Sequence, residues 1–243
     1  MSLQIRLDVT EEIVRDLLSI AGTDIIVVAD DSGSMNSVSD TTNVSAPVTR
    51  WGELKQTLLE LVEMLLIVDH TDGFTLKFLN DPRWYTVTSR AQVEQIFHNR
   101  RPAGITPLAT TLRSVFMGEW AAALKRAEIK EAILLVATDG EPTDTNFSGL
   151  SDLIRNRPRQ PFSYFVTFLM CTEMDDLVDQ YDACIDNIPG CDVVDDYASE
   201  RKQVLKAGRE KTFSRSKWLA KAVLGGKMPK YDRMDEKGCC AVM

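Results

Sequence analysis

The chain contains no long uncharged apolar run, few histidines and no CxxC cysteine pair. The most apolar stretch among its 243 residues, 58–68, is interrupted by Glu60 and Glu63, so we expect no membrane-spanning helix. With only His70 and His98, histidine-rich zinc sites and most Ser-His-Asp catalytic schemes are hard to build. The N-terminus lacks the apolar core of a secretory signal, and the cysteine count is five. These features favour reduced thiols in the cytosol.

Charge is distributed unevenly along the chain. Residues 1–200 hold 16 Lys and Arg against 32 Asp and Glu, whereas residues 201–243 hold 12 against 4. The acidic body argues against nucleic acid as a partner. The basic end leaves open a contact with an anionic surface.

Apolar runs and turn signals predict strands alternating with helices. The run 24–30 lacks polar alternation, which is typical of a strand buried on both faces of a parallel sheet. A turn at 80–83 would make one edge strand antiparallel. We therefore expect an α/β fold: a doubly wound, mainly parallel six-stranded sheet with helices on both faces. Strands are expected at 24–30, 73–79, 84–88, 132–137, 162–169 and 192–194, and helices at 9–20, 51–68, 91–98, 107–127, 148–156, 175–185, 197–207 and 213–224.

Oxygen-bearing side chains follow the predicted central strands. Asp30, Ser32 and Ser34 come after the first strand, Asp139 comes after the strand 132–137, and Thr106 precedes a helix. Ligands of such sheets bind at the carboxyl ends of the strands, where the winding reverses. Carboxylates and hydroxyls suit a hard divalent cation, so the sequence predicts a metal site there.

Each of these pieces alone is also typical of ordinary turn and helix-cap chemistry. Their joint occurrence in order, at predicted strand ends, favours the metal site. Asp31, Glu141 and Asp144 lie nearby in the sequence, and we expect them to be solvated loop acids instead of ligands.

The set Asp30-x-Ser32-x-Ser34, Thr106 and Asp139 resembles the metal-ion-dependent adhesion site (MIDAS) of von Willebrand factor A (vWA) domains, over roughly residues 20–225. The resemblance implies the sheet order 3-2-1-4-5-6 and Mg²⁺ as the ion, with Mn²⁺ or Ca²⁺ as possible substitutes. It implies that Ser32 and Ser34 bind the ion directly, Thr106 directly or through water, and Asp30 and Asp139 often through water. It also implies an open metal position for an Asp or Glu carboxylate of a partner protein.

Two alternatives to a binding module stay open. Asp30 could act as the nucleophile of a Mg²⁺-dependent, phosphatase-like hydrolase, but such enzymes need a second Asp two residues later, where Ser32 stands. The phosphate-binding and nucleophile-elbow motifs G-x-x-x-x-G-K, G-x-G-x-x-G and G-x-S-x-G are also missing, so we expect no enzyme. The other alternative is a scaffold whose metal is purely structural.

The last four residues, Cys240-Ala241-Val242-Met243, resemble a C-a-a-X prenylation box in which Met favours farnesyl on Cys240. Stable anchoring needs a second signal. Palmitate on Cys239 is one candidate, and attraction of basic residues to an anionic leaflet is the other (Lys221, Lys227, Lys230, Arg233 and Lys237). We favour Cys239, because Asp232, Asp235 and Glu236 dilute the basic charge. We expect the helix 213–224 to pack on the sheet instead of on lipid.

These expectations combine into one domain with two extensions. Residues 1–22 are expected to be a helical extension packed on the domain, 23–225 the vWA domain, and 226–243 a basic tail with the lipid-anchor motif. The expected function is Mg²⁺-dependent binding of an acidic protein ligand. The expected location is the cytoplasm, peripheral on the cytosolic face of a membrane.

Overall fold

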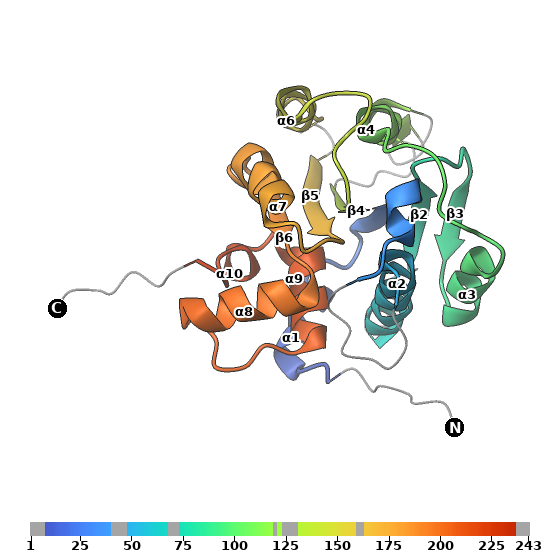
Figure 1. The fold of residues 1–243 in the computed structure, drawn as a ribbon. Coiled ribbons are helices and arrows are strands. Elements are labelled where there is room, and N and C mark those ends of the chain that lie inside the picture. The colour runs from blue at the N-terminus through green and yellow to red at the C-terminus, as the bar shows by residue number, and fades with distance from the viewer. Residues whose placement is uncertain are drawn as a thin grey trace.

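The β-branched run that follows Gly22 and Thr23 forms the centre of a six-stranded sheet (Figure 1). The computed structural model describes residues 8–39, 48–67, 73–118, 121–122, 131–158 and 163–236. The strand order is β3-β2-β1-β4-β5-β6, and only the pairing of β2 with β3 is antiparallel. The predicted fold class is confirmed. The strands are β1 (Asp24–Ala29), β2 (Phe74–Phe78), β3 (Trp84–Val87), β4 (Glu131–Thr138), β5 (Ser163–Met170) and β6 (Cys191–Val194).

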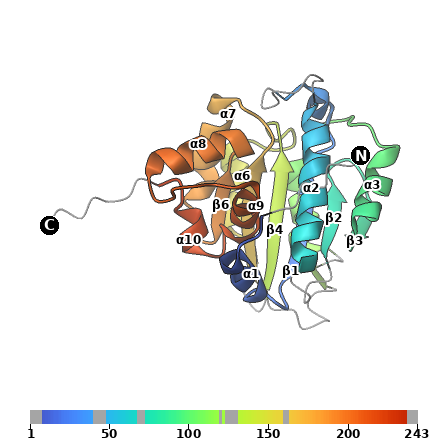
Figure 2. The ribbon, with the colours of Figure 1, turned by 90° about the horizontal axis from the view of Figure 1, so that it is seen from below.

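Helices cover both faces of this sheet because alternate strand residues point to opposite sides. Ile25 and Val27 of β1 belong to one apolar core, and Ile26 and Val28 belong to the other. On the first face, α2 and α9 pack over the strands, and α2 runs alongside β4 (Figure 2). The helices of that face are α1 (Glu11–Leu18), α2 (Arg50–Ile67), α3 (Arg90–His98), α8 (Tyr197–Ala207), α9 (Arg215–Leu224) and α10 (Pro229–Asp232). The second face carries α4 (Leu108–Met117), α6 (Phe147–Arg155) and α7 (Asp175–Tyr181), which continues into a π-helical turn, η2 (Asp182–Asp186).

The first helix is tied to the last two. Thr10 caps α1 by accepting a hydrogen bond from the amide of Ile13, as its position before an amphipathic run predicts. Ile13 is buried in the first core. The hydroxyl of Tyr231 donates to Asp16 Oδ2 at 2.7 Å, and Lys230 forms an ion pair with the same carboxylate. The beginning and end of the described chain therefore pack together.

The helix after Pro107 is shorter than the sequence predicts. It was expected to run to about residue 127, but α4 ends at Met117. Gly118 leaves the helical conformation there while its amide still donates to the carbonyl of Ser114. Glycine is a poor helix former because it loses the most backbone freedom on folding, so the helix stops at this residue. Residues 119–120 and 123–127 of the predicted helix lie outside the described residues, and residues 121–122 between them are helical.

The basic end of the chain is folded further than expected. Tyr231 and Met234 are buried in the first core, although residues after 225 were expected to form a tail. Lys221 is fully buried, and Lys227 and Lys230 form ion pairs with Glu131 and with Glu12 and Asp16 respectively. These three lysines, which the sequence offered as the less favoured second membrane signal, therefore already form ion pairs with acidic groups of the protein.

Helix α9 packs on the sheet as predicted. Its apolar residues are buried, including Trp218 and Leu219. The indole of Trp218 also donates to the carbonyl of Asp195 at 2.9 Å. None of the helices in the described parts of the chain is both long and apolar enough to cross a membrane.

Candidate metal centre

The candidate site lies where β1 and β4 end side by side. Both strands run in the same direction, and Ala29 pairs with Ala137. The amide of Asp30 still donates to the carbonyl of Ala137 at 2.8 Å, so Asp30 leaves its strand directly beside Asp139. Since β2 continues the sheet on one side of β1 and β5 continues it beyond β4, this is the point where the winding reverses.

Hydrogen bonds connect the first three predicted ligands to Asp139. The amide of Ser32 donates to Asp30 Oδ1 at 2.8 Å, which curls the loop around that carboxylate. The hydroxyls of Ser32 and Ser34 lie 3.0 Å apart, and Ser34 Oγ donates to Asp139 Oδ1 at 2.7 Å. A short 3₁₀ turn, η1 (Gly33–Asn36), holds Ser34 in this position. Four of the five predicted residues thus form one continuous hydrogen-bonded group, in which the backbone amide of Ser32 makes the link to Asp30.

Thr106 reaches the same space from a separate loop. Two backbone hydrogen bonds align this loop with the one after β1. The amide of Gly33 donates to the carbonyl of Gly104 at 3.2 Å, and the amide of Ala103 donates to the backbone carbonyl of Asp31 at 2.7 Å. Gly104 has φ of +104°, a conformation that residues with a side chain rarely adopt. The amide of Thr106 donates to Thr143 Oγ1 at 3.1 Å, which ties it to the loop after β4.

Gly140, in the loop after β4, lies next to Thr106 and Ser34. A Cβ at this residue would lie 3.5 Å from Thr106 Oγ1 and 3.9 Å from Ser34 Oγ. Both hydroxyls therefore lie close to Gly140, in the loop that also carries Asp139. The structure brings all five predicted side chains together at this edge of the sheet.

The two carboxylates of the site are buried, and of the two only Asp139 forms an ion pair within the described residues, with Arg50. Asp30 is completely buried and Asp139 is 2% exposed. Burial raises the pKa of Asp30, while hydrogen bonds from Ser32 and Thr138 oppose that rise and the nearby Asp139 adds to it. Two carboxylates and three hydroxyls are the donors that Mg²⁺ or Ca²⁺ prefers, so the side chains fit a hard divalent cation.

Sequence reasoning missed two residues that contact the predicted ligands. Arg50 Nη1 donates to Asp139 Oδ2 at 2.8 Å, and the guanidinium is largely buried. Thr138 Oγ1 donates to Asp30 Oδ2 at 2.7 Å. Arg50 begins α2, where a positive charge opposes the helix dipole. A cation in that unfavourable position was the one local sign that Arg50 has a partner elsewhere.

The neighbouring acids have different roles from one another. Asp31 was expected to be solvated, but it is only 5% exposed. Its carboxylate forms an ion pair with Arg100 at 3.2 Å and accepts hydrogen bonds from the amide and side chain of Asn80. It therefore anchors the loop and points away from the ligand set. The Asp144 carboxylate accepts hydrogen bonds from the amides of Ala109 and Thr110 at the start of α4. Glu141 is exposed.

The candidate lipidation residues, Cys239 and Cys240, lie outside the described residues. Three cysteines are described, and all are free thiols: Cys171, Cys184 and Cys191. Burial raises the pKa of Cys171 well above its usual value, and the nearby carboxylates of Asp139 and Asp30 add to this. Burial also raises the pKa of Cys184, to about 11, so Cys171 and Cys184 are poor nucleophiles at neutral pH.

Comparisons with known proteins identify no family for the chain. No protein-family model matches it, and no curated protein sequence matches it. Among solved structures, it is similar to proximal thread matrix protein 1 of the mussel byssus, with 15% sequence identity and a TM-score of 0.48. The similarity covers 76% of this chain and 46% of the mussel chain, so less than half of that protein is spanned. The functional assignment therefore rests on the geometry of the site itself.

Proposed function

We propose that this protein is a vWA-type binding module that holds Mg²⁺ with Asp30, Ser32, Ser34, Thr106 and Asp139. The observation that carries the proposal is the chain of contacts from Asp30 through Ser32 and Ser34 to Asp139. Five oxygen-bearing side chains from three loops face one small space at the sheet's switch point. In the proposed role, Mn²⁺ or Ca²⁺ can substitute for Mg²⁺.

The proposed ligand of the metal is an Asp or Glu carboxylate of a partner protein. Neutral hydroxyls leave a bound Mg²⁺ attractive to a further anionic oxygen. Ser34 and Gly33 are exposed, which supports access from outside. Ile105, next to Thr106, is a large apolar residue that is 60% exposed. An exposed apolar side chain beside a charged site is typical of a protein-binding surface.

Binding is favoured over catalysis by the surroundings of Asp30. A phosphoryl-accepting aspartate needs a free carboxylate oxygen facing solvent and an acid nearby. Asp30 is completely buried, and both of its oxygens accept hydrogen bonds, from the Ser32 amide and the Thr138 hydroxyl. A phosphatase assay with and without Mg²⁺ distinguishes the hydrolase alternative, and we expect no Mg²⁺-dependent turnover.

Capture of partner proteins with and without EDTA tests the binding role. We expect prey that depends on Mg²⁺ and is lost with Ser34→Ala, which removes one proposed ligand. Ser148→Ala is the matched control, because Ser148 is an exposed serine on α6, away from the site. Prey that is retained in EDTA would instead favour the scaffold with a structural metal.

The proposal includes a lipid anchor at the cytosolic face of a membrane. It rests on the sequence Cys240-Ala241-Val242-Met243, with farnesyl proposed on Cys240 and palmitate on Cys239. Palmitate is preferred as the second signal because Lys221, Lys227 and Lys230 are engaged in ion pairs within the fold. Cys240→Ser is expected to move the protein from the membrane fraction to the soluble fraction, and an unchanged distribution would refute the anchor.

A further inference from the structure

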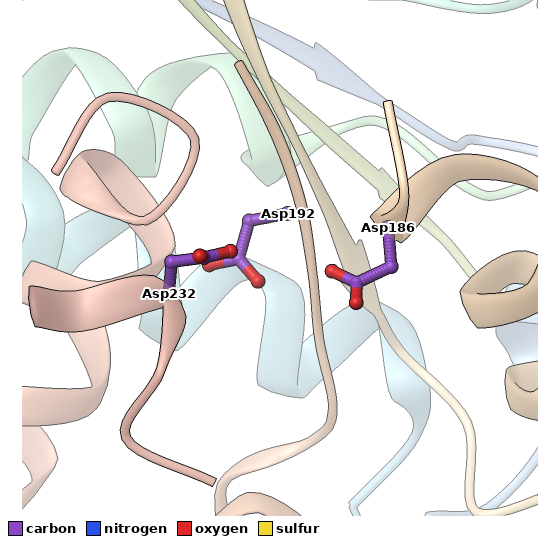
Figure 3. A group of neighbouring side chains, drawn as sticks. All are labelled: Asp186, Asp192 and Asp232. Carbon is purple, nitrogen blue, oxygen red and sulfur yellow. The ribbon is translucent and has the colours of Figure 1, made fainter. Parts of the chain in front are cut away.

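Three aspartates from separate elements meet beside the edge strand β6. Asp186 ends η2, Asp192 lies in β6 and Asp232 ends α10. One carboxylate oxygen of each lies within 4.8 Å of the other two. Figure 3 shows the Asp186 carboxylate turned toward Asp192, which lies beside Asp232. This span is close to the distance across a Ca²⁺ ion, whose oxygen ligands lie at about 2.4 Å.

Asp192 carries an oxygen that has no donor within the described part of the chain. The residue is 1% exposed, and its Oδ2 accepts no hydrogen bond there. Gly225 lies against this oxygen so closely that a Cβ on the glycine would collide with it. An unpaired buried carboxylate oxygen is costly because it has lost its water without gaining a donor. The unpaired oxygen is therefore evidence for a ligand that supplies positive charge.

Lys221 balances only part of the negative charge around Asp192. Its ammonium lies 3.2 Å from Asp235, 3.5 Å from Glu200 and 3.8 Å from Asp192 Oδ1. One ammonium thus serves three carboxylates, and its contact with Asp192 is to Oδ1. It also donates to the backbone carbonyl of Asp232 at 3.1 Å. Asp186 and Asp232 have no ion pair with a lysine or arginine within the described residues.

The remaining charges facing the cluster are also negative. Burial raises the pKa of Asp186, and it raises the pKa of Asp232 to about 6. Neighbouring carboxylates add to both shifts, and Lys221 opposes them. Helix α9 ends at Leu224, directly before Gly225, and the C-terminal end of a helix carries partial negative charge. A cation at this position would be stabilised by every one of these groups except Lys221.

We propose that Asp186, Asp192 and Asp232 form a second cation site that takes Ca²⁺. Three carboxylates make a hard oxygen donor set, and the exposed side of Asp186 lets water complete the coordination of a large ion. This site is separate from the one between β1 and β4, since its residues come from β6, η2 and α10. Bound Ca²⁺ would tie α10, and with it the end of the chain, to the edge of the sheet.

Calorimetric titration of Ca²⁺ into the full chain, in excess Mg²⁺, tests this site. We expect one equivalent of Ca²⁺ to bind the wild type, and the affinity to fall at least tenfold in Asp186→Asn/Asp232→Asn. Both substituted residues lie outside the apolar cores, so this variant keeps the fold, which circular dichroism checks. Asp152→Asn, an exposed aspartate on α6, is the matched control.

Asp139→Ala separates the two proposed sites. We expect this variant to retain the Ca²⁺ equivalent, because Asp139 belongs only to the site after β4. Loss of Ca²⁺ binding in Asp139→Ala would assign the ion to that site and overturn the proposal. Equal Ca²⁺ binding by wild type and Asp186→Asn/Asp232→Asn would also overturn it, and would mean that Lys221 and bound protons balance the cluster.

Discussion

Arg50 Nη1 lies 2.8 Å from Asp139 Oδ2, so a guanidinium neutralises one of the carboxylates proposed to hold the metal. The pair joins the first residue of α2 to the loop after β4, and the Asp139 side chain is fully buried. In this arrangement Arg50 is the resident positive charge of the site. In the proposed site, Arg50 and a divalent cation would therefore compete for the same carboxylate.

Arg50→Gln is expected to have opposite effects on the metal-free fold and on Mg²⁺ affinity. Without the guanidinium, buried Asp139 loses its charged partner, and the metal-free protein is destabilised by about 1–3 kcal/mol. Removal of one positive charge close to the ion raises Mg²⁺ affinity, by roughly three- to tenfold. Urea unfolding and calorimetry measure the two effects. A variant with weaker Mg²⁺ binding would mean that Arg50 positions Asp139 for the ion instead of competing with it.

Gly104→Ala is expected to disturb the Thr106 loop. The backbone has φ of +104°, and an added Cβ would lie 2.7 Å from Asn80 Oδ1. The strain of this conformation costs about 1–2 kcal/mol, and the contact with Asn80 adds to it. Gly22→Ala is a matched control, since Gly22 has φ of +84° but nothing within 4 Å of the added atom. If both variants lose equal stability and bind Mg²⁺ equally, the contact with Asn80 does not determine the conformation of the Thr106 loop.

The stability of the metal-free protein should fall as pH rises from about 4 to about 8. Burial raises the pKa of Asp182 and Glu200 to about 7 and that of Asp195 to about 8. Between the unfolded and folded pKa values, the folded protein holds more protons than the unfolded chain, so the free energy of unfolding decreases with pH. Urea unfolding across this range checks the slope, and Asp195→Asn should flatten it. A free energy that increases with pH would contradict the assignment.

Lys221→Met should be strongly destabilising near pH 8 and less so near pH 5.5. The Lys221 side chain is fully buried and holds Asp192, Glu200 and Asp235. Its loss leaves buried carboxylates without a partner, at a cost of about 3–5 kcal/mol. At lower pH these carboxylates take up protons and the cost shrinks. The control Lys217→Met, which breaks a partly exposed pair with Glu210, should cost under about 1 kcal/mol at either pH. Equal losses for Lys221→Met at both pH values would show that its charge is unimportant.

The sheet, and the meeting of the proposed ligand side chains at its switch point, were predictable because their signals are local. The run before Asp30 has no polar alternation, and such a strand is buried on both faces of a parallel sheet. Strand ends of a doubly wound sheet meet at one edge, so the positions of Asp30 and Asp139 in the sequence were enough to expect them side by side. Capping by Thr10 was likewise visible in the sequence.

The ion pairs were not predictable because they join distant parts of the chain. Asp31 differs from an ordinary loop acid only in having Arg100 beside it in the fold, 69 residues later. Lys221 belongs to a basic stretch of sequence, yet the packing of α9 places its side chain beside the buried acids Asp192 and Glu200. The group of Asp186, Asp192 and Asp232 needs three separated elements to come together, which only the tertiary fold specifies.

Calorimetric titration of Mg²⁺ into the wild type and Asp30→Ala tests the central claim most directly. The account predicts one Mg²⁺ equivalent for the wild type and for the control Asp152→Ala, and at least tenfold weaker binding for Asp30→Ala. Equal Mg²⁺ affinity in wild type and Asp30→Ala would contradict the claim that the side chains after β1 and β4 hold the metal.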